Sequence, residues 1–268
     1  MKLIEPKVEL LSELDITPES HIARCARVYY GREYKEPNQE DDKKIVDDLV
    51  KKGNISILRH ASVYGRWWIV RPPLGDLESE FVSTLRDGKG NKYVSTNKQY
   101  ESEHTLDFLK ISPGEFLEDA IKTPHLFYIF RLTFCITTQI STISPNNIVE
   151  NAKYFSSKDD LEICRPWWFN LKEKPGDSYI FYKSWKRAEE TCKAVLELGM
   201  KPEDAIGVLP LDTAIKVVYT HSVEKWKNIL DYCAIEKSNP NAKLMIEKIR
   251  EEIDKFAAKY RINYNIRN

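Results

Sequence analysis

The sequence predicts an α+β fold in which helix exceeds strand, and three observations support this prediction. Alternating apolar residues at 8–14 (VELLSEL) are typical of a half-buried strand. The aromatic and β-branched run at 60–70 predicts a second strand. Apolar residues recur with helical spacing at 178–198 and 240–260, which predicts two long amphipathic helices.

Capping residues define two helices near the start of the chain. Thr17 is a suitable N-cap and Pro18 a favourable first helical residue, so a helix is predicted from there to Gly31. A second helix is predicted over about 41–52, because it ends at Gly53 and has lysines in its last turn, where the helix dipole favours positive charge. Both helices precede the aromatic strand.

The segment at 74–122 differs in character from its surroundings. The turn sequence DGKGN at 87–91 separates two strand-like stretches and predicts a β-hairpin. The rest of the segment is polar, with few apolar residues for a core of its own. We therefore predict a single domain over 1–268 with an insertion at about 74–122.

The second half of the chain is predicted to be mainly helical. A short helix is expected to start at Pro202 and stop before Pro210. The segment 211–233 is interpreted as one amphipathic helix, like the two long helices at 178–198 and 240–260.

Charge and cysteine content narrow the functional classes. Lys+Arg and Asp+Glu are balanced at 41 each, whereas a binder of nucleic acid polymers usually has basic excess. The five cysteines lack zinc spacing, and their odd number argues against a disulfide framework. The most apolar stretch, 126–140, contains Arg131 and is too short to span a bilayer. We therefore expect a cytoplasmic protein with no metal site and neither membrane nor nucleic-acid partners.

Four sequence blocks resemble the flavin-dependent thymidylate synthase family and occur in the family's order. They are ARVYYG at 26–31, LRHAS at 58–62, ENAKY at 150–154, and PEDA followed by VLPL and a long helix from 202 onward. The resemblance implies the family's fold, a central antiparallel or mixed sheet flanked by long helices. It also implies reductive methylation of dUMP to dTMP with FAD, methylenetetrahydrofolate as one-carbon donor and NAD(P)H as reductant. Family members are homotetramers with the flavin at subunit interfaces.

The resemblance also assigns roles to individual residues of this chain. The cofactor-binding candidates, which fall on flavin-contacting positions, are His60, Ser62 and Asn228. The substrate-binding candidates are Gln139, Asn151, Lys153 and Lys216. Five of them have an ordinary role as the alternative: His60 as a structural histidine, Gln139 as a polar residue near the end of an element, Asn151 as the cap of a turn, and Lys153 and Lys216 as solvated lysines.

The family's hallmark motif, R-H-R-x-x-S-x-N-E-x-S-x-R-Y, is largely replaced in this chain. When the motif's end is placed on Lys153 and Tyr154, its basic triplet falls on Ser, Thr and Ile at 141–143, and no arginine lies between Arg131 and Arg165. Arginine offers bidentate, charge-assisted contacts of about 1.5–3 kcal/mol each, which short hydroxyls do not match. The flavin side of the family's site is therefore predicted to be better preserved than the nucleotide side.

Cys233 stands where the family has a substrate-binding arginine, and two roles are considered for it. A thiolate facing the nucleotide could act as a nucleophile, with Lys237 lowering its pKa. The commoner role is that of a small buried residue on an amphipathic helix, and this is the one we favour.

Thymidylate synthesis is thus the default hypothesis, and two alternatives stay open. One is a flavin-binding paralogue that acts on a different nucleotide or nucleoside, which the loss of basic motif residues favours. The other is a non-catalytic structural or interaction protein on an inherited fold, since a fold does not determine function.

Overall fold

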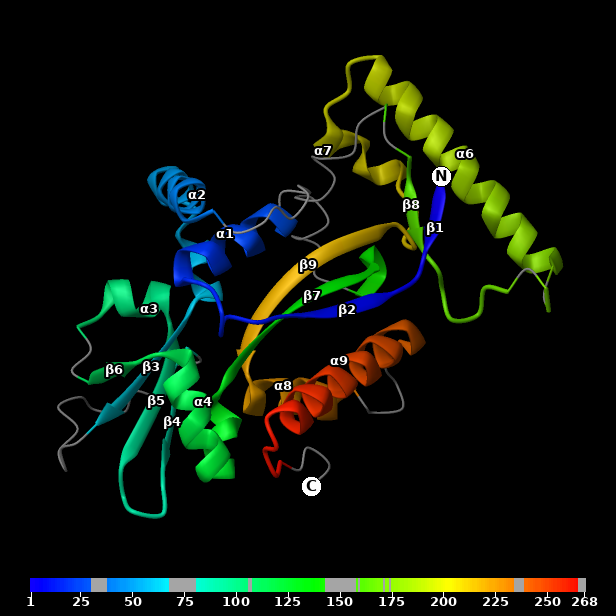
Figure 1. The fold of residues 1–268 in the computed structure, drawn as a ribbon. Helices are drawn as coiled ribbons and strands as arrows, with labels where there is room; N and C mark the ends of the chain where they lie inside the picture. The colour runs from blue at the N-terminus through cyan, green and yellow to red at the C-terminus, as the bar shows by residue number, and fades with distance from the viewer. Residues whose placement is uncertain are drawn as a thin grey trace.

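The computed structural model describes residues 1–29, 38–67, 81–105, 108–142, 158, 160–170, 172–173, 175–233 and 239–264 of the chain. Antiparallel sheets and long helices make up this structure, so the predicted α+β class is confirmed (Figure 1).

A three-stranded antiparallel sheet forms the centre of the molecule. Its strand order is β2 (Lys7–Leu11), β7 (Arg131–Gln139) and β9 (Ala214–Ser222). All nine residues of β7 are buried, because this strand is paired on both edges. Side chains alternate between the two faces of a strand, so the sheet has two chemically distinct faces.

The apolar face of this sheet carries the main core. Helices α8 (Val223–Cys233) and α9 (Pro240–Lys259) lie on it, below the strands in Figure 1. Trp226 of α8 packs edge-on against Phe134, and its indole Nε1 donates a 3.0 Å hydrogen bond to the Leu132 carbonyl. The buried indole therefore has its polar group satisfied, as buried tryptophan requires.

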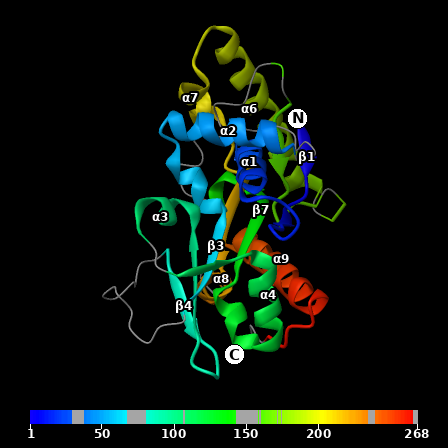
Figure 2. The same cartoon turned by 60° about the vertical axis from the view of Figure 1, so that its left-hand side comes forward.

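The opposite face is partly covered by α1 (Pro18–Tyr29), and α2 (Gln39–Lys51) packs on α1 (Figure 2). Arg27 of α1 forms a buried ion pair with Asp42 of α2, at 2.5 Å between Nη2 and Oδ1. The backbone N–H of Asn38 donates to the other carboxylate oxygen. The predicted start of α1 and both boundaries of α2 are confirmed to within a few residues, whereas the predicted end of the first helix at Gly31 lies outside the described residues.

A second antiparallel sheet has the strand order β4 (Ser83–Arg86), β5 (Lys92–Asn97), β3 (Ser62–Trp67) and β6 (Leu109–Ile111). The hairpin predicted from DGKGN is confirmed, because β4 pairs with β5.

Helices α3 (Lys98–Glu103) and α4 (Pro113–Lys122) follow these strands, and α4 starts with a capping box. Tyr93 of β5 and Phe116 of α4 belong to the main core. The described part of 74–122 thus packs on the same core as the rest, and its interpretation as an insertion in one domain stays a prediction.

A short parallel pair, β1 (Lys2–Ile4) and β8 (Glu162–Cys164), lies outside these two sheets. The long helix α6 (Pro175–Glu197) packs there through Trp185, which touches a small core with Leu161 and Phe169. The short helix α7 spans Pro202–Ala205. The 3-10 segments are η1 (Ile55–His60), η2 (Pro124–Ile129), η3 (Ile140–Thr142) and η4 (Ile206–Val208).

Two sequence-based boundaries need correction. The segment 211–233 is not one helix: its first part is strand β9, and α8 begins only at Val223. Its run of β-branched and aromatic residues pairs along the whole of β7, and this pairing overrides the apparent helical spacing. The strand predicted from 60 begins at Ser62, because His60 is the last residue of η1.

Two further observations concern only the residues that the structure describes. None of their helices is long and apolar enough to cross a membrane. None of their His, Cys, Asp and Glu side chains form a group of three or more that could hold a metal ion.

Candidate functional site

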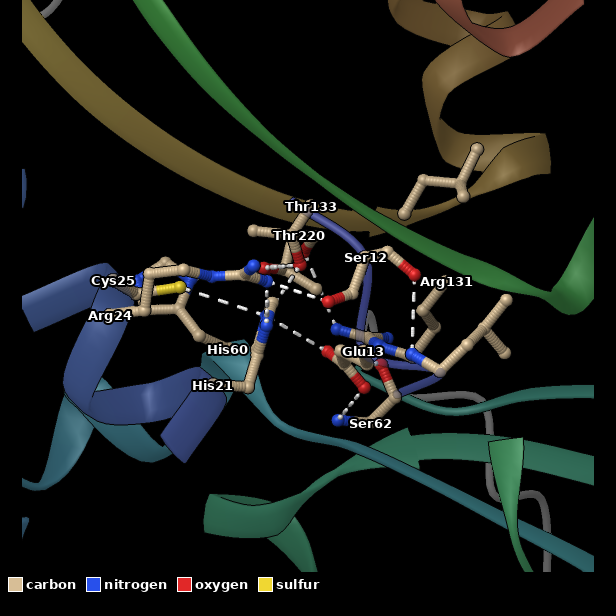
Figure 3. A network of polar contacts seen from close by, with 12 residues as sticks. Ser12, Glu13, His21, Arg24, Cys25, His60, Ser62, Arg131, Thr133 and Thr220 are labelled. Atoms are coloured by element: carbon tan, nitrogen blue, oxygen red, sulfur yellow. Dashed lines mark hydrogen bonds and ion pairs between the residues drawn. The ribbon is translucent and has the colours of Figure 1, made fainter. Parts of the chain in front are cut away.

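His60 and Ser62 lie in a buried polar network on the α1-covered face of the central sheet (Figure 3). The imidazole Nδ1 of His60 is 3.0 Å from the Thr220 hydroxyl on β9. Ser62 donates twice to Glu13, from its backbone N–H to Oε2 and from its hydroxyl to Oε1, both at 3.1 Å. Two of the three predicted flavin contacts are therefore held by groups from other parts of the chain.

Hydrogen bonds join Glu13 to His60 through three intermediate side chains. His21 Nε2 on α1 is 3.1 Å from both Glu13 Oε1 and the Thr133 hydroxyl. Thr133 and Thr220 face each other across β7 and β9, with their hydroxyl oxygens 2.7 Å apart. We call these five residues, Glu13, His21, Thr133, Thr220 and His60, the Glu13–His60 network.

One direction of donation gives every hydrogen between His21 Nδ1 and His60 Nδ1 an acceptor. Arg24 can only donate, so its 2.7 Å contact makes His21 Nδ1 an acceptor and leaves the proton on Nε2. His21 then donates from Nε2, Thr133 donates to Thr220, and Thr220 donates to His60 Nδ1. His60 therefore carries its proton on Nε2, and no hydrogen bond to this Nε2 occurs within the described ranges.

The charges in this region follow from burial. Burial lowers the pKa of His60 to about 4, and the positive charge of Arg131 adds to the effect. Burial likewise lowers the pKa of His21 well below its usual range. Burial raises the pKa of Glu13 to about 7, although hydrogen bonds from Ser62 oppose this. At neutral pH both histidines are thus neutral, and Glu13 lies near its titration midpoint.

Arg131 is the one buried cation among the described residues of β7. Its side chain is 9% exposed, and its Nη2 donates to the Thr220 carbonyl at 3.4 Å. Its Nε has no hydrogen-bond partner in the described part of the chain. Burial lowers its pKa, while Tyr64 and Glu13 favour its charged form. Arg131 and Glu13 therefore compensate each other electrostatically.

Gln139 and Lys216 lie at the other end of the same sheet face. Lys216 is exposed and is four residues along β9 from Thr220, opposite Thr137 in the register. Gln139 is buried, and its amide donates to the Cys164 carbonyl at 3.0 Å. This amide is therefore already used by the protein backbone, whereas the Lys216 ammonium faces solvent.

Asn228 is separated from His60 and Ser62. It is exposed on α8, which packs on the apolar face of the sheet, so the three predicted flavin contacts lie on opposite faces within one chain. Cys233 is the last residue of α8. The environment of the Cys233 side chain, and the predicted positions Asn151 and Lys153, lie outside the described residues.

The replaced motif begins in η3, directly after β7. The Thr142 hydroxyl donates to the Gln139 carbonyl at 2.8 Å and lies 2.8 Å from the Thr138 hydroxyl. The Ser141 hydroxyl is 3.4 Å from the Gln139 side-chain oxygen. These two motif positions thus make local hydrogen bonds, and Ile143 lies beyond the described range.

Sequence reasoning missed Glu13, His21 and the two threonines of the network. Arg131 offered one signal, because a charged residue inside an otherwise apolar strand requires a polar environment. The alternating Thr133, Cys135 and Thr137 of β7 were a second signal of a polar face. The Glu13–Ser62 contact spans 49 positions and has no local signature.

Comparisons with known proteins place the chain in a family. Residues 125–257 match the family model described as thymidylate synthase complementing protein. The chain belongs to this family. It is the flavin-dependent thymidylate synthase family that the four sequence blocks resemble, so that prediction is confirmed. The match to the thymidylate synthase complementing protein family includes β7, β9 and α8, but not His60 or Ser62.

Solved structures provide a more distant similarity. The chain is similar to the crystal structure of a UMP/dUMP methylase PolB from Streptomyces cacaoi bound with 5-Br dUMP. The identity is 14% and the TM-score 0.38, over 95% of this chain and 93% of that chain. No curated protein matches the sequence.

The side chains at the predicted cofactor positions fit a flavin in their chemistry but do not converge within one chain. A neutral imidazole whose Nε2–H has no partner among the described residues and an exposed primary amide both offer hydrogen bonds to ring carbonyls and nitrogens. His60 and Asn228 lie on opposite sides of the sheet, so these two side chains do not face a common site within one chain.

Proposed function

We propose that this protein is a flavin-dependent methylase of a uracil nucleotide, with dUMP as the default substrate and dTMP as the product. Methylenetetrahydrofolate would be the one-carbon donor, and NAD(P)H would reduce FAD. The observation that carries this proposal is the hydrogen bond between His60 and Thr220. It links the LRHAS block to the segment that matches the family and holds His60 as a neutral Nε2–H donor.

The protein's own contribution to such a reaction is placement. Reduced flavin supplies a hydride equivalent when bound. His60 would present its Nε2–H to the cofactor, because Thr220 occupies Nδ1. Asn228 would offer its exposed amide from a second copy, which is consistent with the expected homotetramer. The free thiols of Cys25, Cys135, Cys164 and Cys192 suit a reducing, cytoplasmic compartment.

A second candidate is a flavin enzyme that acts on another nucleotide or a nucleoside. The local hydrogen bonds of Ser141 and Thr142 favour it, because both hydroxyls already contact Gln139 at the end of β7. Gln139 is likewise bound to the Cys164 carbonyl. A substrate with less phosphate charge would need fewer cationic contacts on this side.

The visible absorbance of the purified protein tests the flavin part of the proposal. A bound oxidised flavin gives a band near roughly 450 nm. A protein that stays colourless after incubation with FAD and gel filtration would favour a non-catalytic role. If flavin is bound, calorimetric titration with dUMP and deoxyuridine separates the two enzymatic candidates, since the dUMP methylase must prefer the nucleotide.

Cys233 is tested separately by Cys233→Ala. If its thiolate is the nucleophile, the variant loses activity but keeps flavin binding. We expect unchanged activity, because a small packing role is the commoner one for a cysteine on an amphipathic helix.

A further inference from the structure

An open pocket adjoins the Glu13–His60 network on the side of Ser62. It has a volume of about 430 Å³ and lies between the residues that lead into α1, the start of β3, and the region where β6 leads into α4. Ligand sites in proteins typically measure about 300–1,000 Å³. We call it the Glu13 pocket, because Glu13 contributes the carboxylate of the network to its wall.

We propose that the Glu13 pocket binds a planar heterocycle that donates an N–H to Glu13 and has an anionic tail directed toward Lys98 and Lys110. A uracil nucleotide and a reduced folate share this chemistry. The choice between these two ligands rests on the proposed function, whereas the pocket itself does not.

Glu13 has room for one more donor. Its side chain is 13% exposed, so a ligand in the pocket can reach it. Oε1 is shared by the Ser62 hydroxyl and His21, while Oε2 accepts only the Ser62 N–H among the described residues. Each carboxylate oxygen has two lone pairs. Oε2 therefore keeps one acceptor position for an N–H of the ligand.

The walls and the rim of the pocket differ in chemistry. Its walls include the apolar side chains of Leu14, Ile16, Val63, Ile111 and Pro113, which suit the faces of a planar ring. At the rim, two lysines surround a single carboxylate.

The rim has a net positive charge. Lys98 and Lys110 are 42% and 62% exposed, and both pair with Glu101. Their two charges exceed that of the one carboxylate, so an anionic tail finds a cationic edge. The N-terminus of α4 adds little attraction for an anion, because Ser112 and Glu115 already form its capping box. Both lysines come from 74–122 and would supply charge that the replaced motif lacks.

Ligand binding should be linked to protons. The titratable and polar groups around Glu13 are His21, Arg24 and Cys25 from α1, Ser62 and Tyr64 from β3, Arg131 from β7, and the three charged residues of the rim. Among them, Arg131 and Arg24 favour the ionised carboxylate, yet burial holds the pKa of Glu13 at about 7. An N–H donor binds the ionised form better, so binding near pH 7 should release a proton.

Isothermal titration of the full chain with dUMP, deoxyuridine and 5-formyltetrahydrofolate tests the proposal. We expect binding of dUMP or the folate, with proton release seen as a heat that changes between two buffers of different ionisation enthalpy. The double variant Lys98→Ala, Lys110→Ala should weaken this binding about tenfold, since two exposed charge contacts are lost. The matched control Lys89→Ala removes an exposed lysine at the hairpin tip and should bind like wild type. If dUMP is the ligand, deoxyuridine should bind more weakly.

Several outcomes would overturn the proposal. They are the absence of binding by both ligands, equal affinity of the lysine double variant and wild type, or binding without proton release. Glu13→Gln should abolish the proton release; if this variant does not fold in a melting experiment, the lysine variants decide alone. If the protein forms dTMP but ligand binding does not depend on Lys98 and Lys110, the Glu13 pocket is refuted and the proposed function stands. If ligand binding depends on these lysines but the protein neither binds flavin nor forms dTMP, the pocket stands and the proposed function is refuted.

Discussion

Thr220 is the residue whose hydroxyl joins the two halves of the Glu13–His60 network, and Thr220→Val removes that hydroxyl with little change in shape. The substitution takes the acceptor from the buried Thr133 hydroxyl and the donor from His60 Nδ1. A buried polar group left without its partner costs about 1–3 kcal/mol. We therefore expect Thr220→Val to lower the free energy of unfolding by about 3 kcal/mol.

Thr220→Ser is the matched control, because it keeps the hydroxyl and removes one methyl group. Loss of a buried methyl costs about 1 kcal/mol. The serine variant should thus be about 2 kcal/mol more stable than the valine variant in urea unfolding at pH 7. ¹⁵N spectra of the His60 ring give a second readout: wild type and Thr220→Ser should show a neutral ring protonated on Nε2, and Thr220→Val should not hold that tautomer. Equal stabilities and equal ring spectra would refute the hydrogen-bond chain.

Three other substitutions test separate features of the fold. Arg27→Ala leaves the carboxylate of Asp42 buried without its cation and should cost about 3–5 kcal/mol in urea unfolding; a loss below about 1 kcal/mol would contradict the buried ion pair. Gly65→Ala places a methyl group into the ring of Phe108. It should therefore lower the melting temperature, and Gly65→Ala combined with Phe108→Ala should lose less than the sum of the two single variants. Burial raises the pKa of Glu13 from 4.5 to about 7, so the folded state keeps a proton that the unfolded state releases in this range. Its contribution to stability is then full below pH 4.5 and is lost as the pH rises to about 7. Relative to wild type, Glu13→Gln should gain roughly 3 kcal/mol between these two pH values, and a pH-independent difference would contradict the raised pKa.

The sequence was sufficient wherever local chemistry determines an element. The cap at Thr17 and the DGKGN turn act within a few residues of their own position, and the structure has a helix and a hairpin there. The prediction from sequence failed at 211–233, because pairing along β7 decides the conformation there. The spacing of the apolar residues alone did not reveal this pairing.

The candidate site was predictable only in part, for a related reason. His60 and Ser62 could be found from the LRHAS block, because that block is continuous in the sequence. Their partners could not: Thr220 is 160 positions from His60, and Glu13 is 49 positions from Ser62. The separation of Asn228 from His60 depends on which sheet face each element covers, and the chain order of helices and strands does not specify this.

Conversion of dUMP tests the proposed activity of this protein most directly. The purified protein is incubated with FAD, NADPH, methylenetetrahydrofolate and dUMP labelled with tritium at C5, and both tritium release to water and dTMP are measured. We expect flavin-dependent tritium release together with dTMP formation, and both should be reduced in a His60→Ala variant that still folds. Bound flavin without tritium release or dTMP would contradict thymidylate synthesis and favour a different acceptor.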